Sequence, residues 1–354
     1  MKNGRLAVDY VTDLEARRGG NWDRREFVKG LAALTGSAGL LGYNPRQAAA
    51  EPPPETIRIR LVRESSICLA PVYIAEEFLQ AEGFSDVQYV PLEGTLGTGQ
   101  MLGAGKADLG ADAAPALILN LEAGEPIVLF GGVHVGCYEL FGTDRVRTIR
   151  DLKGKKVAVT QLRDDRHAFI AAMAAHVGLD PRKDINWVVH PVEEAVQLLK
   201  EGRIDAFIGF PPEPQELRAK KIGHVVVNTA ADKPWSQYFC SMAVANRDFA
   251  TKHPVATKRA LRALLKAADL CAREPERVAR FLVDRKYTEQ YEYARQTLRE
   301  VPYTRWREYV PEDTVRFYAL RLHEGGMIKS SPKKIITQGT DWRFLNELKK
   351  ELKA

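Results

Sequence analysis

The sequence predicts an α/β protein built on parallel sheets. Short runs of β-branched residues alternate with stretches that repeat apolar residues at helical spacing. This alternation is typical of βα units, in which a helix follows each strand and covers the sheet. The length of 354 residues allows two compact domains or one large one.

A first series of strands and helices follows the proline-rich residues 52–54. Residues 57–62 alternate apolar and basic side chains and are expected to form a strand. A helix is expected over residues 71–82, because Pro71 suits its first turn. The series then continues with strands at 87–92, 107–111 and 127–133 and helices at 98–104 and 113–123.

A second series begins at Lys155. Strands are expected at 156–159, 185–190, 206–208 and 225–227, and helices at 167–177, 193–200 and 212–219. From Pro254 onward the chain is expected to be almost wholly helical, since apolar residues recur there at positions such as 261, 264, 265 and 268.

Residues 1–50 contain the three parts of an export signal. The motif Arg24-Arg25-Glu26-Phe27-Val28-Lys29 resembles a twin-arginine signal, and an apolar run at 30–42 and small residues at 48–50 follow it. The apolar run is too short and too rich in Gly, Ser and Thr to anchor in a bilayer. We therefore expect export to the periplasm by the twin-arginine route. The alternative is a basic amphipathic helix of the mature protein.

The net charge of +6 gives no indication of nucleic-acid binding. Residues 1–50 hold eight Lys/Arg and five Asp/Glu, which leaves 44 bases and 41 acids, or +3, on the remaining three hundred residues. A nearly neutral chain of this size lacks the basic surface that nucleic acids require.

The sequence contains no catalytic or metal-binding motif that we can identify. The four cysteines do not occur at CxxC spacing, so buried free thiols and two disulfides both remain open. The seven histidines show no metal-ligand spacing, and no nucleophile elbow, P-loop or dinucleotide-binding motif is present. We predict no catalytic residue, no metal and no cofactor.

Seven short segments occur in a characteristic order across residues 57–268. They are residues 70–75 (APVYIA), 105–110 (GKADLG), 124–127 (GEPI), 151–159 (DLKGKKVAV), 178–181 (GLDP), 202–206 (GRIDA) and 253–254 (HP). In this order they resemble the solute-binding proteins of ABC importers for aliphatic sulfonates, taurine, nitrate and thiamine-pyrimidine precursors.

The resemblance implies the two-lobed periplasmic-binding-protein fold of type II, with the ligand cleft between the lobes. Lobe 1 is expected to comprise residues 56–140 and 244–354, and lobe 2 residues 141–243, with crossings near Phe141 and Ala243. Independently, open α/β sheets bind ligands beyond the carboxyl ends of their strands. Both arguments place the site in the loops that follow the strands.

Three loops of lobe 1 supply candidate binding residues. Ser65 and Ser66 follow the first strand and are expected either to hold an anionic group or to cap a helix. Asp112 precedes a helix and is either an N-cap or a ligand contact. His134 ends a strand and is either a ligand contact or a structural histidine.

One loop of lobe 2 departs from the family pattern. Arg163, Arg166 and His167 replace a loop rich in Gly, Ser and Thr, and they suit a carboxylate, sulfonate or phosphonate at a helix N-terminus. The alternative is an exposed loop in which Asp164 and Asp165 neutralise the two arginines.

Three further residues of lobe 2 are candidates. Phe210 is expected to stack on a planar ligand. Glu213 is either a ligand contact or a partner of its helix dipole, and Trp235 either forms an aromatic wall or packs the hinge.

The sequence therefore predicts the solute-binding component of an ABC importer. We expect a monomer that captures a small organic anion and delivers it to an inner-membrane permease and its ATPase. One alternative is a periplasmic sensor. Another is an enzyme of thiamine-pyrimidine synthesis, but such relatives carry a cysteine-rich iron-binding segment where this chain has only Cys240.

Overall fold

The computed structural model describes residues 51–64 and 66–352. The chain divides into two units, and the fold described here is that of the second, Pro52–Ala354. The export signal expected within residues 1–50 lies outside the described residues, as does Ser65. Among the described helices, none combines the length and apolar character needed to cross a membrane.

The first sheet has five strands in the order β2-β1-β3-β10-β4. Strands β1, β2 and β3 run parallel, whereas β10 pairs antiparallel with both β3 and β4. The strands are β1 (Arg58–Arg63), β2 (Asp86–Pro91), β3 (Leu109–Ala113), β4 (Ile127–Val135) and β10 (Phe239–Asn246).

The second sheet repeats this arrangement, with the order β7-β6-β8-β5-β9. Strands β6, β7 and β8 are parallel, and β5 pairs antiparallel with β8 and β9. The strands are β5 (Glu139–Gly142), β6 (Lys156–Val159), β7 (Asn186–Val189), β8 (Ala206–Gly209) and β9 (His224–Asn228).

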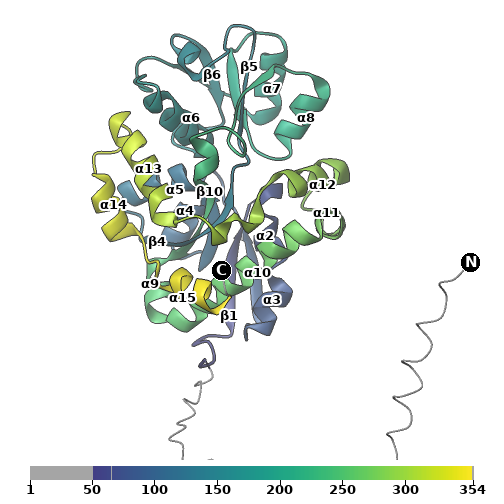
Figure 1. Cartoon of the computed structure of the whole chain (residues 1–354), viewed down its shortest axis with the longest axis vertical. Coiled ribbons are helices and arrows are strands. Elements are labelled where there is room, and N and C mark those ends of the chain that lie inside the picture. Colours follow the sequence, from purple (N-terminus) through teal and green to yellow (C-terminus); the bar gives the residue numbers. More distant parts are fainter. Residues whose placement is uncertain (1–50, 65, 353–354) are drawn as a thin grey trace, which may run out of the picture. The chain divides into compact units, whose positions relative to one another are not determined.

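Helices cover both sheets and define two lobes (Figure 1). Lobe 1 carries α2 (Ala70–Tyr73), α3 (Glu76–Ala81), α4 (Thr98–Gly103), α5 (Ala114–Glu122), α9 (Arg247–Lys252), α10 (Pro254–Arg273), α11 (Pro275–Asp284), α12 (Tyr291–Glu300), α13 (Pro311–Glu324), α14 (Pro332–Gly339) and α15 (Arg343–Glu351). Lobe 2 carries α6 (Asp165–His176), α7 (Val192–Lys200) and α8 (Glu213–Lys220). Short 3-10 turns are η2 (Ile67–Leu69), η3 (Ile149–Leu152), η4 (Trp235–Gln237) and η5 (Tyr303–Arg307).

Local sequence explains several of the helix boundaries. Helices α10, α11, α13 and α14 each begin on a proline, whose fixed φ and missing N–H suit the first helical position. The expected apolar stripe of α10, with Leu261, Leu264 and Leu265, is fully buried in lobe 1. The expected helix over residues 71–82 is instead interrupted between α2 and α3.

Strands β5 and β10 are absent from the sequence-based prediction. Strand β5 is only four residues long, and β10 (FCSMAVAN) is rich in residues without a strong strand preference. Both become strands because they pair on two sides with other strands. As a result the chain passes between the sheets at residues 136–138 and 229–238, a few residues before the expected crossings.

The two crossing segments are bonded to each other. Thr229 Oγ1 accepts hydrogen bonds from the backbone N–H groups of Cys137 and Tyr138 at 3.1 and 3.0 Å, and it donates to Tyr138 O at 2.8 Å. Gly136 has φ 48°, and a Cβ there would lie 2.2 Å from Ala230 Cα. The crossing therefore requires glycine for both its conformation and its space.

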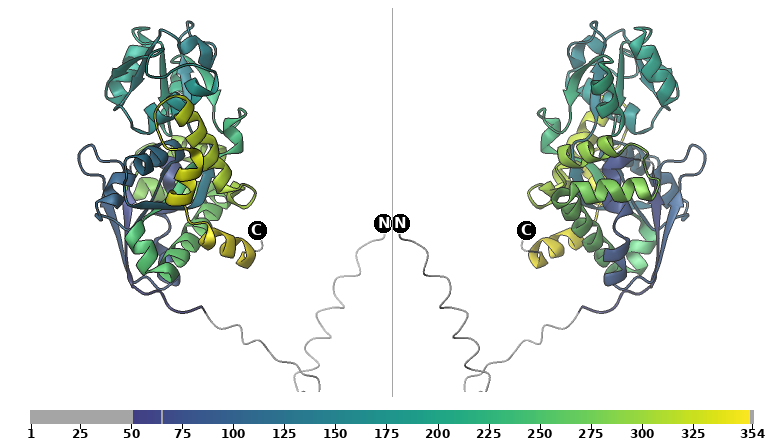
Figure 2. Two further views of the ribbon diagram at one scale, coloured as in Figure 1. Left: turned by 90° about the vertical axis from the view of Figure 1, so that its left-hand side faces the viewer. Right: turned by 90° about the vertical axis from the view of Figure 1, so that its right-hand side faces the viewer.

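Lobe 1 also contacts lobe 2 outside these crossings. Helix α13 lies beside α6, as Figures 1 and 2 show, and Tyr318 meets Phe169 edge to face at 5.5 Å between ring centroids. Helix α12 meets α8, where Arg218 Nη2 donates to Glu300 Oε2 at 2.6 Å and Gln215 Nε2 donates to the same carboxylate at 3.0 Å. These contacts hold the two lobes together on both sides of the crossings.

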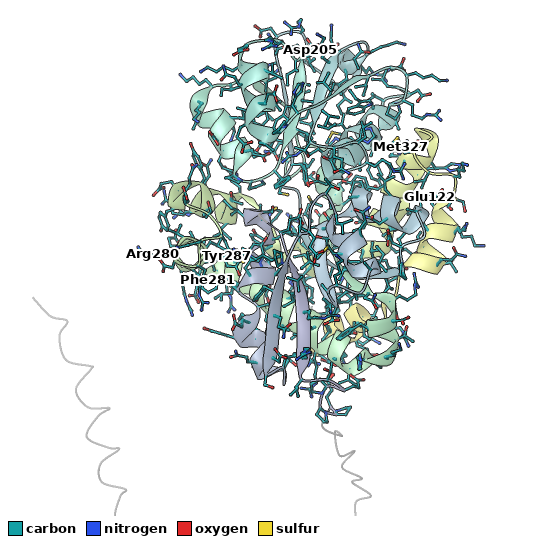
Figure 3. All side chains as sticks on the ribbon, turned by 180° about the vertical axis from the view of Figure 1, so that it is seen from behind. Glu122, Asp205, Arg280, Phe281, Tyr287 and Met327 are labelled. Carbon is teal, nitrogen blue, oxygen red and sulfur yellow. The ribbon has the colours of Figure 1, made fainter. Side chains whose placement is uncertain are left out.

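Equivalent ion pairs lie at the amino ends of the parallel strands in the two sheets. Asp108, just before β3, accepts from the Arg60 backbone N–H at 2.8 Å and from its guanidinium at 2.7 Å. Asp205, just before β8, accepts from the Lys156 N–H at 2.8 Å and pairs with Arg145. Figure 3 shows Asp205 at the end of lobe 2 remote from lobe 1. The GKADLG and GRIDA segments thus have the same structural role in the two lobes.

Candidate ligand-binding cleft

The loops at the carboxyl ends of both sheets face one another around a small cavity of about 20 Å³. This position follows from the topology, because parallel strands end at the same edge and the antiparallel β10 begins there. Polar and aromatic residues that line the cavity are Glu64, Ser66, Asp112 and His134 from lobe 1, Tyr138 from a crossing segment and Phe210 from lobe 2.

A wider groove of about 360 Å³ adjoins this cavity and shares Glu64 and Asp112 with it. One wall consists of residues 92–100 and of side chains of α5 in lobe 1. The opposite wall is the loop 161–165 of lobe 2. The groove gives solvent a route from the surface to the acidic side of the cavity.

Acidic residues dominate the electrostatics of the cavity. Burial, reinforced by Asp165 nearby, raises the pKa of Asp112 from 3.8 to about 8. Desolvation, followed by the charges of Asp112 and Asp165, raises the pKa of Glu64 well above its usual range. Burial and Asp165 likewise raise the pKa of Asp164 to about 6.

The contacts of these acids leave their charges unbalanced. Glu64 accepts from the Thr98 hydroxyl at 3.3 Å, Asp112 from the Ala113 N–H at 2.6 Å, and Asp165 from the Tyr138 hydroxyl. Within the described part of the chain, no Lys, Arg or His forms an ion pair with Glu64, Asp112, Asp164 or Asp165. Asp112 is buried and the other three acids are half-buried, and acids placed in this way are typical of functional sites.

Sulfur atoms and an imidazole form another side of the same cavity. All four cysteines are buried free thiols, which resolves the alternative left open by the sequence. Cys137 Sγ lies 3.3 Å from Cys240 Sγ, and Cys68 Sγ lies 3.1 Å from Ser66 Oγ. Burial raises the pKa of the Cys68 thiol, but Cys137 and His134 more than offset this and hold it well below its usual range.

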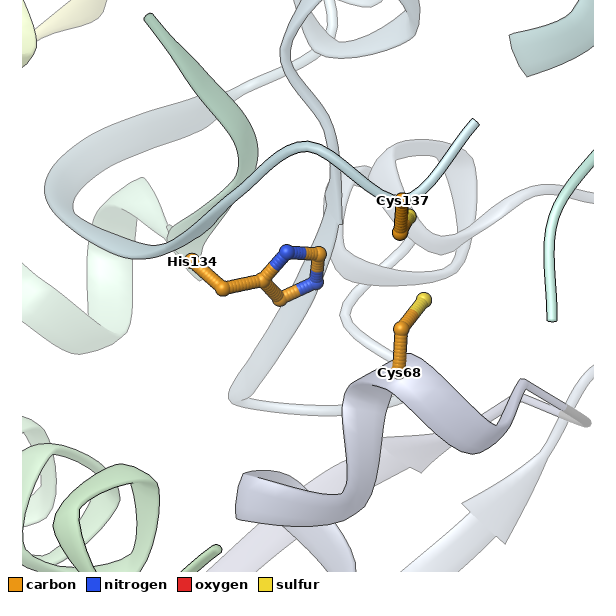
Figure 4. A group of neighbouring side chains, drawn as sticks. All are labelled: Cys68, His134 and Cys137. Atoms are coloured by element: carbon orange, nitrogen blue, oxygen red, sulfur yellow. The ribbon is translucent and has the colours of Figure 1, made fainter. Parts of the chain in front are cut away.

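His134 completes this sulfur-lined side. Its side chain is 0% exposed, and neither ring nitrogen has a hydrogen-bond partner among the described residues. Donor atoms of Cys68, His134 and Cys137 all lie within 4.8 Å of one another, and Figure 4 shows the three side chains pointing together. These three residues are the ones in the described structure that could hold a metal ion.

The lobe 1 candidates from the sequence lie at or near the cavity. Ser66 makes no helix-capping hydrogen bond and lines the cavity instead. Asp112 and His134 also line it, and the side chain of Asp112 does not cap α5. Ser65 lies outside the described residues.

In lobe 2, Arg163 and Arg166 have different environments. Arg163 is exposed on the groove wall and has φ 72°, with its N–H donating to His167 Nδ1 at 2.9 Å. Arg166 is only 2% exposed, and its guanidinium pairs with both carboxylate oxygens of Glu213 at 2.7 Å. It also lies over the Phe210 ring at 4.3 Å. Because Glu213 already neutralises Arg166, the Arg166 guanidinium is engaged within lobe 2, whereas Arg163 remains exposed on the groove wall.

The remaining lobe 2 candidates divide between the interior and the cavity. Phe210 lines the cavity, and its N–H donates to Glu213 at 3.2 Å. Burial lowers the pKa of His167 to about 4, and its ring packs on Trp187 instead of facing the groove. Trp235 is 2% exposed and packs between His176 and Phe317, outside the cavity lining.

Several lining residues were not candidates in the sequence. Glu64 and Cys68 belong to the loop after the first strand, which was expected to face the cleft, but only its serines were selected. Asp165 was considered only as a partner of the arginines. Cys137 and Cys240 are 103 residues apart, so no spacing in the sequence indicates that they meet.

Apart from this cleft, a surface pocket lies between α3, α10 and α11 on lobe 1. Figure 3 labels two aromatic residues at this part of the lobe, Phe281 and Tyr287, whose rings are 6.4 Å apart. The pocket shares no lining residue with the cavity, so we do not consider it part of the same site.

Two five-stranded α/β lobes with a cavity at their crossing define the fold of periplasmic binding proteins. The chain belongs to the NMT1/THI5-like family. The model of that family matches residues 67–278, which are more than half of this chain. Both the expected fold class and the family resemblance are therefore confirmed.

Solved structures with this fold include two named binding proteins. The periplasmic nitrate-binding protein NrtA from Synechocystis has a TM-score of 0.68 and 18% identity, covering 85% of this chain and 90% of that one. The periplasmic aliphatic sulphonate binding protein SsuA from Escherichia coli has a TM-score of 0.61 and 18% identity, covering 78% and 90%. At this identity the similarity establishes the fold alone.

A curated relative with detectable sequence similarity is the bicarbonate-binding protein CmpA from Synechococcus elongatus. It is 30% identical over 112 residues, which are 31% of this chain and 24% of CmpA. The match thus spans about a quarter of the relative's length.

Proposed function

We propose that this protein is the solute-binding component of an ABC importer and works in the periplasm. The lobes close on one small solute, and the closed form delivers it to an inner-membrane permease powered by an ATPase. A cavity lined by both lobes and by a segment that crosses between them carries this proposal, because a ligand there would couple binding to lobe movement. The twin-arginine signal proposed for residues 1–50 supplies the route of export.

The charges in the cavity favour a solute that carries a positive group. Desolvation, and after it repulsion between the neighbouring acids, raises the pKa values of Glu64 and Asp112, and a cationic group between Glu64, Asp112 and Asp165 would offset both effects. The Tyr138 and Phe210 rings, with centroids 5.4 Å apart, offer an apolar surface for a planar portion of the solute. The small organic anion expected from the sequence is the alternative to this solute.

A small organic anion, such as a sulfonate or carboxylate, is the second candidate. It is favoured by Arg163, an exposed guanidinium on the wall of the adjoining groove. An anion would then bind nearer the mouth of the cleft than the acidic residues do.

A thermal-shift screen with matched aromatic amines and aromatic carboxylates of equal size would separate the two candidates. We expect amines to raise the melting temperature of the full chain. Glu64→Gln and Asp112→Asn should each weaken amine binding by about tenfold or more, equivalent to about 1.4 kcal/mol. Glu289→Gln removes an exposed acid and serves as the control. Binding of carboxylates only, weakened by Arg163→Ala, would support the anion instead, and binding of neither class would contradict both.

A further inference from the structure

We propose that the sulfur-lined side of the cavity is a binding site for one thiophilic metal ion of the Zn²⁺ type. Its ligands are Cys68 Sγ, Cys137 Sγ and one ring nitrogen of His134. The inference concerns these three residues alone and does not depend on which solute the importer binds.

The spacing of the donor atoms fits a tetrahedral centre. Zinc binds thiolates at about 2.3 Å and imidazole nitrogen at about 2.0 Å, so two sulfurs on one tetrahedral ion lie about 3.8 Å apart. The donor atoms of Cys68, His134 and Cys137 are all within 4.8 Å of one another. The donor atoms are therefore about as close together as the ligands of one tetrahedral ion.

The imidazole of His134 provides an independent indication of a ligand. A buried polar group without a hydrogen bond destabilises a folded protein. Both ring nitrogens of His134 are in this situation within the described structure, although the ring is fully buried and directed at two thiols. A metal ion bonded to one nitrogen would satisfy one of these two atoms.

The surroundings also suit a positive ion. Two carboxyl groups, that of the half-buried Glu64 and that of the buried Asp112, line the same cavity without a basic partner among the described residues. Cys240 Sγ, 3.3 Å from Cys137 Sγ, is the nearest additional donor. The fourth coordination position thus faces either this thiol or the open cavity, as in zinc sites that exchange a ligand.

The test uses the full chain purified under reducing, anaerobic conditions. Co²⁺ is added first, because tetrahedral cobalt bound to thiolate gives a charge-transfer band and visible d–d bands, and Zn²⁺ is then added in competition. We expect one ion per chain. Cys68→Ser, Cys137→Ser and His134→Gln should each weaken binding at least about 100-fold. Cys271→Ser is the matched control, since Cys271 is an equally buried thiol in α10 that does not belong to the cluster.

X-ray absorption at the zinc edge of the unmodified protein provides a measurement that does not rely on the variants folding. It should show at least two sulfur neighbours near 2.3 Å and one nitrogen near 2.0 Å. A shell of oxygen atoms only, or equal affinity in the control and the three ligand variants, would overturn the proposal. So would a Cys137–Cys240 disulfide in peptides of the exported protein, because a disulfide sulfur is not a thiolate ligand.

Discussion

Buried acids at the two ends of the first sheet have contrasting environments. At the amino ends, Asp108 is bonded to the backbone and the guanidinium of Arg60. At the carboxyl ends, Asp112 lies four residues further along the same segment, equally buried, and accepts only from the Ala113 N–H among the described groups. The second sheet repeats the paired aspartate at its amino end, with Asp205 bound to Lys156 N and Arg145.

This contrast separates acids that stabilise a lobe from acids that remain available to a ligand. A buried carboxylate with all its acceptor positions occupied fixes local structure, and removing its charge leaves donors unsatisfied. A buried carboxyl group without a basic partner destabilises the empty protein when it ionises, which is a feature of binding and catalytic sites. Substituting the same residue type at the two positions therefore tests the distinction directly.

The largest effect is expected for Asp108→Asn. The aspartate accepts on both oxygens from Arg60, whereas asparagine presents an NH₂ group to one of these donors. We expect the free energy of unfolding to fall by about 2 kcal/mol, measured by urea denaturation, with the pair partly exposed to solvent. Solute affinity should be unchanged once the variant is folded. A loss of affinity without a loss of stability would contradict the structural role.

An effect of the same order but opposite sign is expected for Asp112→Asn. The pKa of Asp112 is raised from 3.8 to about 8 in the folded protein, so folding favours its protonated form. The stability that this provides is complete below pH 4 and is lost as the pH rises to about 8. An asparagine at position 112 is neutral at every pH, so the variant does not lose this stability as the pH rises. The variant should therefore gain on the order of 1–3 kcal/mol over the original protein at pH 8, and less at pH 5.

Urea denaturation of both proteins at pH 5 and pH 8 measures this difference. The Asp108→Asn variant serves as its matched control, because it should be destabilised at both pH values. If Asp112→Asn destabilised the protein equally at pH 5 and pH 8, Asp112 would be a structural acid like Asp108.

The sequence predicted the alternating strands and helices of each lobe better than the segments that connect the two sheets. Alternating strands and helices, and the seven family segments, indicated two α/β lobes because each element buries its own apolar side. Strands β5 and β10 were missed because neither carries a strong local strand signal and both depend on partners distant in the chain. The crossing positions shifted by a few residues for the same reason.

The candidate site was predictable at the level of loops but not of side chains. The carboxyl-end rule selected the loops that hold Asp112, His134 and Phe210, all of which line the cavity. It did not indicate that Arg166 pairs with Glu213, 47 residues away, or that His134 meets Cys68 from another loop. Such encounters are set by the packing of separate elements, which a single sequence does not specify.

The smallest effect is expected for an ion pair at the carboxyl ends that joins the lobes. Arg218 on α8 bonds to Glu300 on α12, and both side chains are roughly a third exposed, so their coupling should be only about 0.5–1 kcal/mol. A double-mutant cycle of Arg218→Ala and Glu300→Gln, followed by urea denaturation, measures this coupling. The control is the cycle of Glu292→Gln and Arg295→Ala, a pair within α12 that does not cross between lobes.

The Glu292–Arg295 control distinguishes an effect on the closure of the lobes from the effect of removing a surface charge. Small-angle scattering of the solute-free full chain should show a larger radius of gyration for Glu300→Gln than for Glu292→Gln, because only Glu300 bonds to lobe 2. An ion pair at the amino ends stays within one lobe and stabilises it, whereas this pair favours the closed arrangement of both. Equal radii for the two variants would mean that the contacts of α13 with α6 are enough to keep the lobes closed.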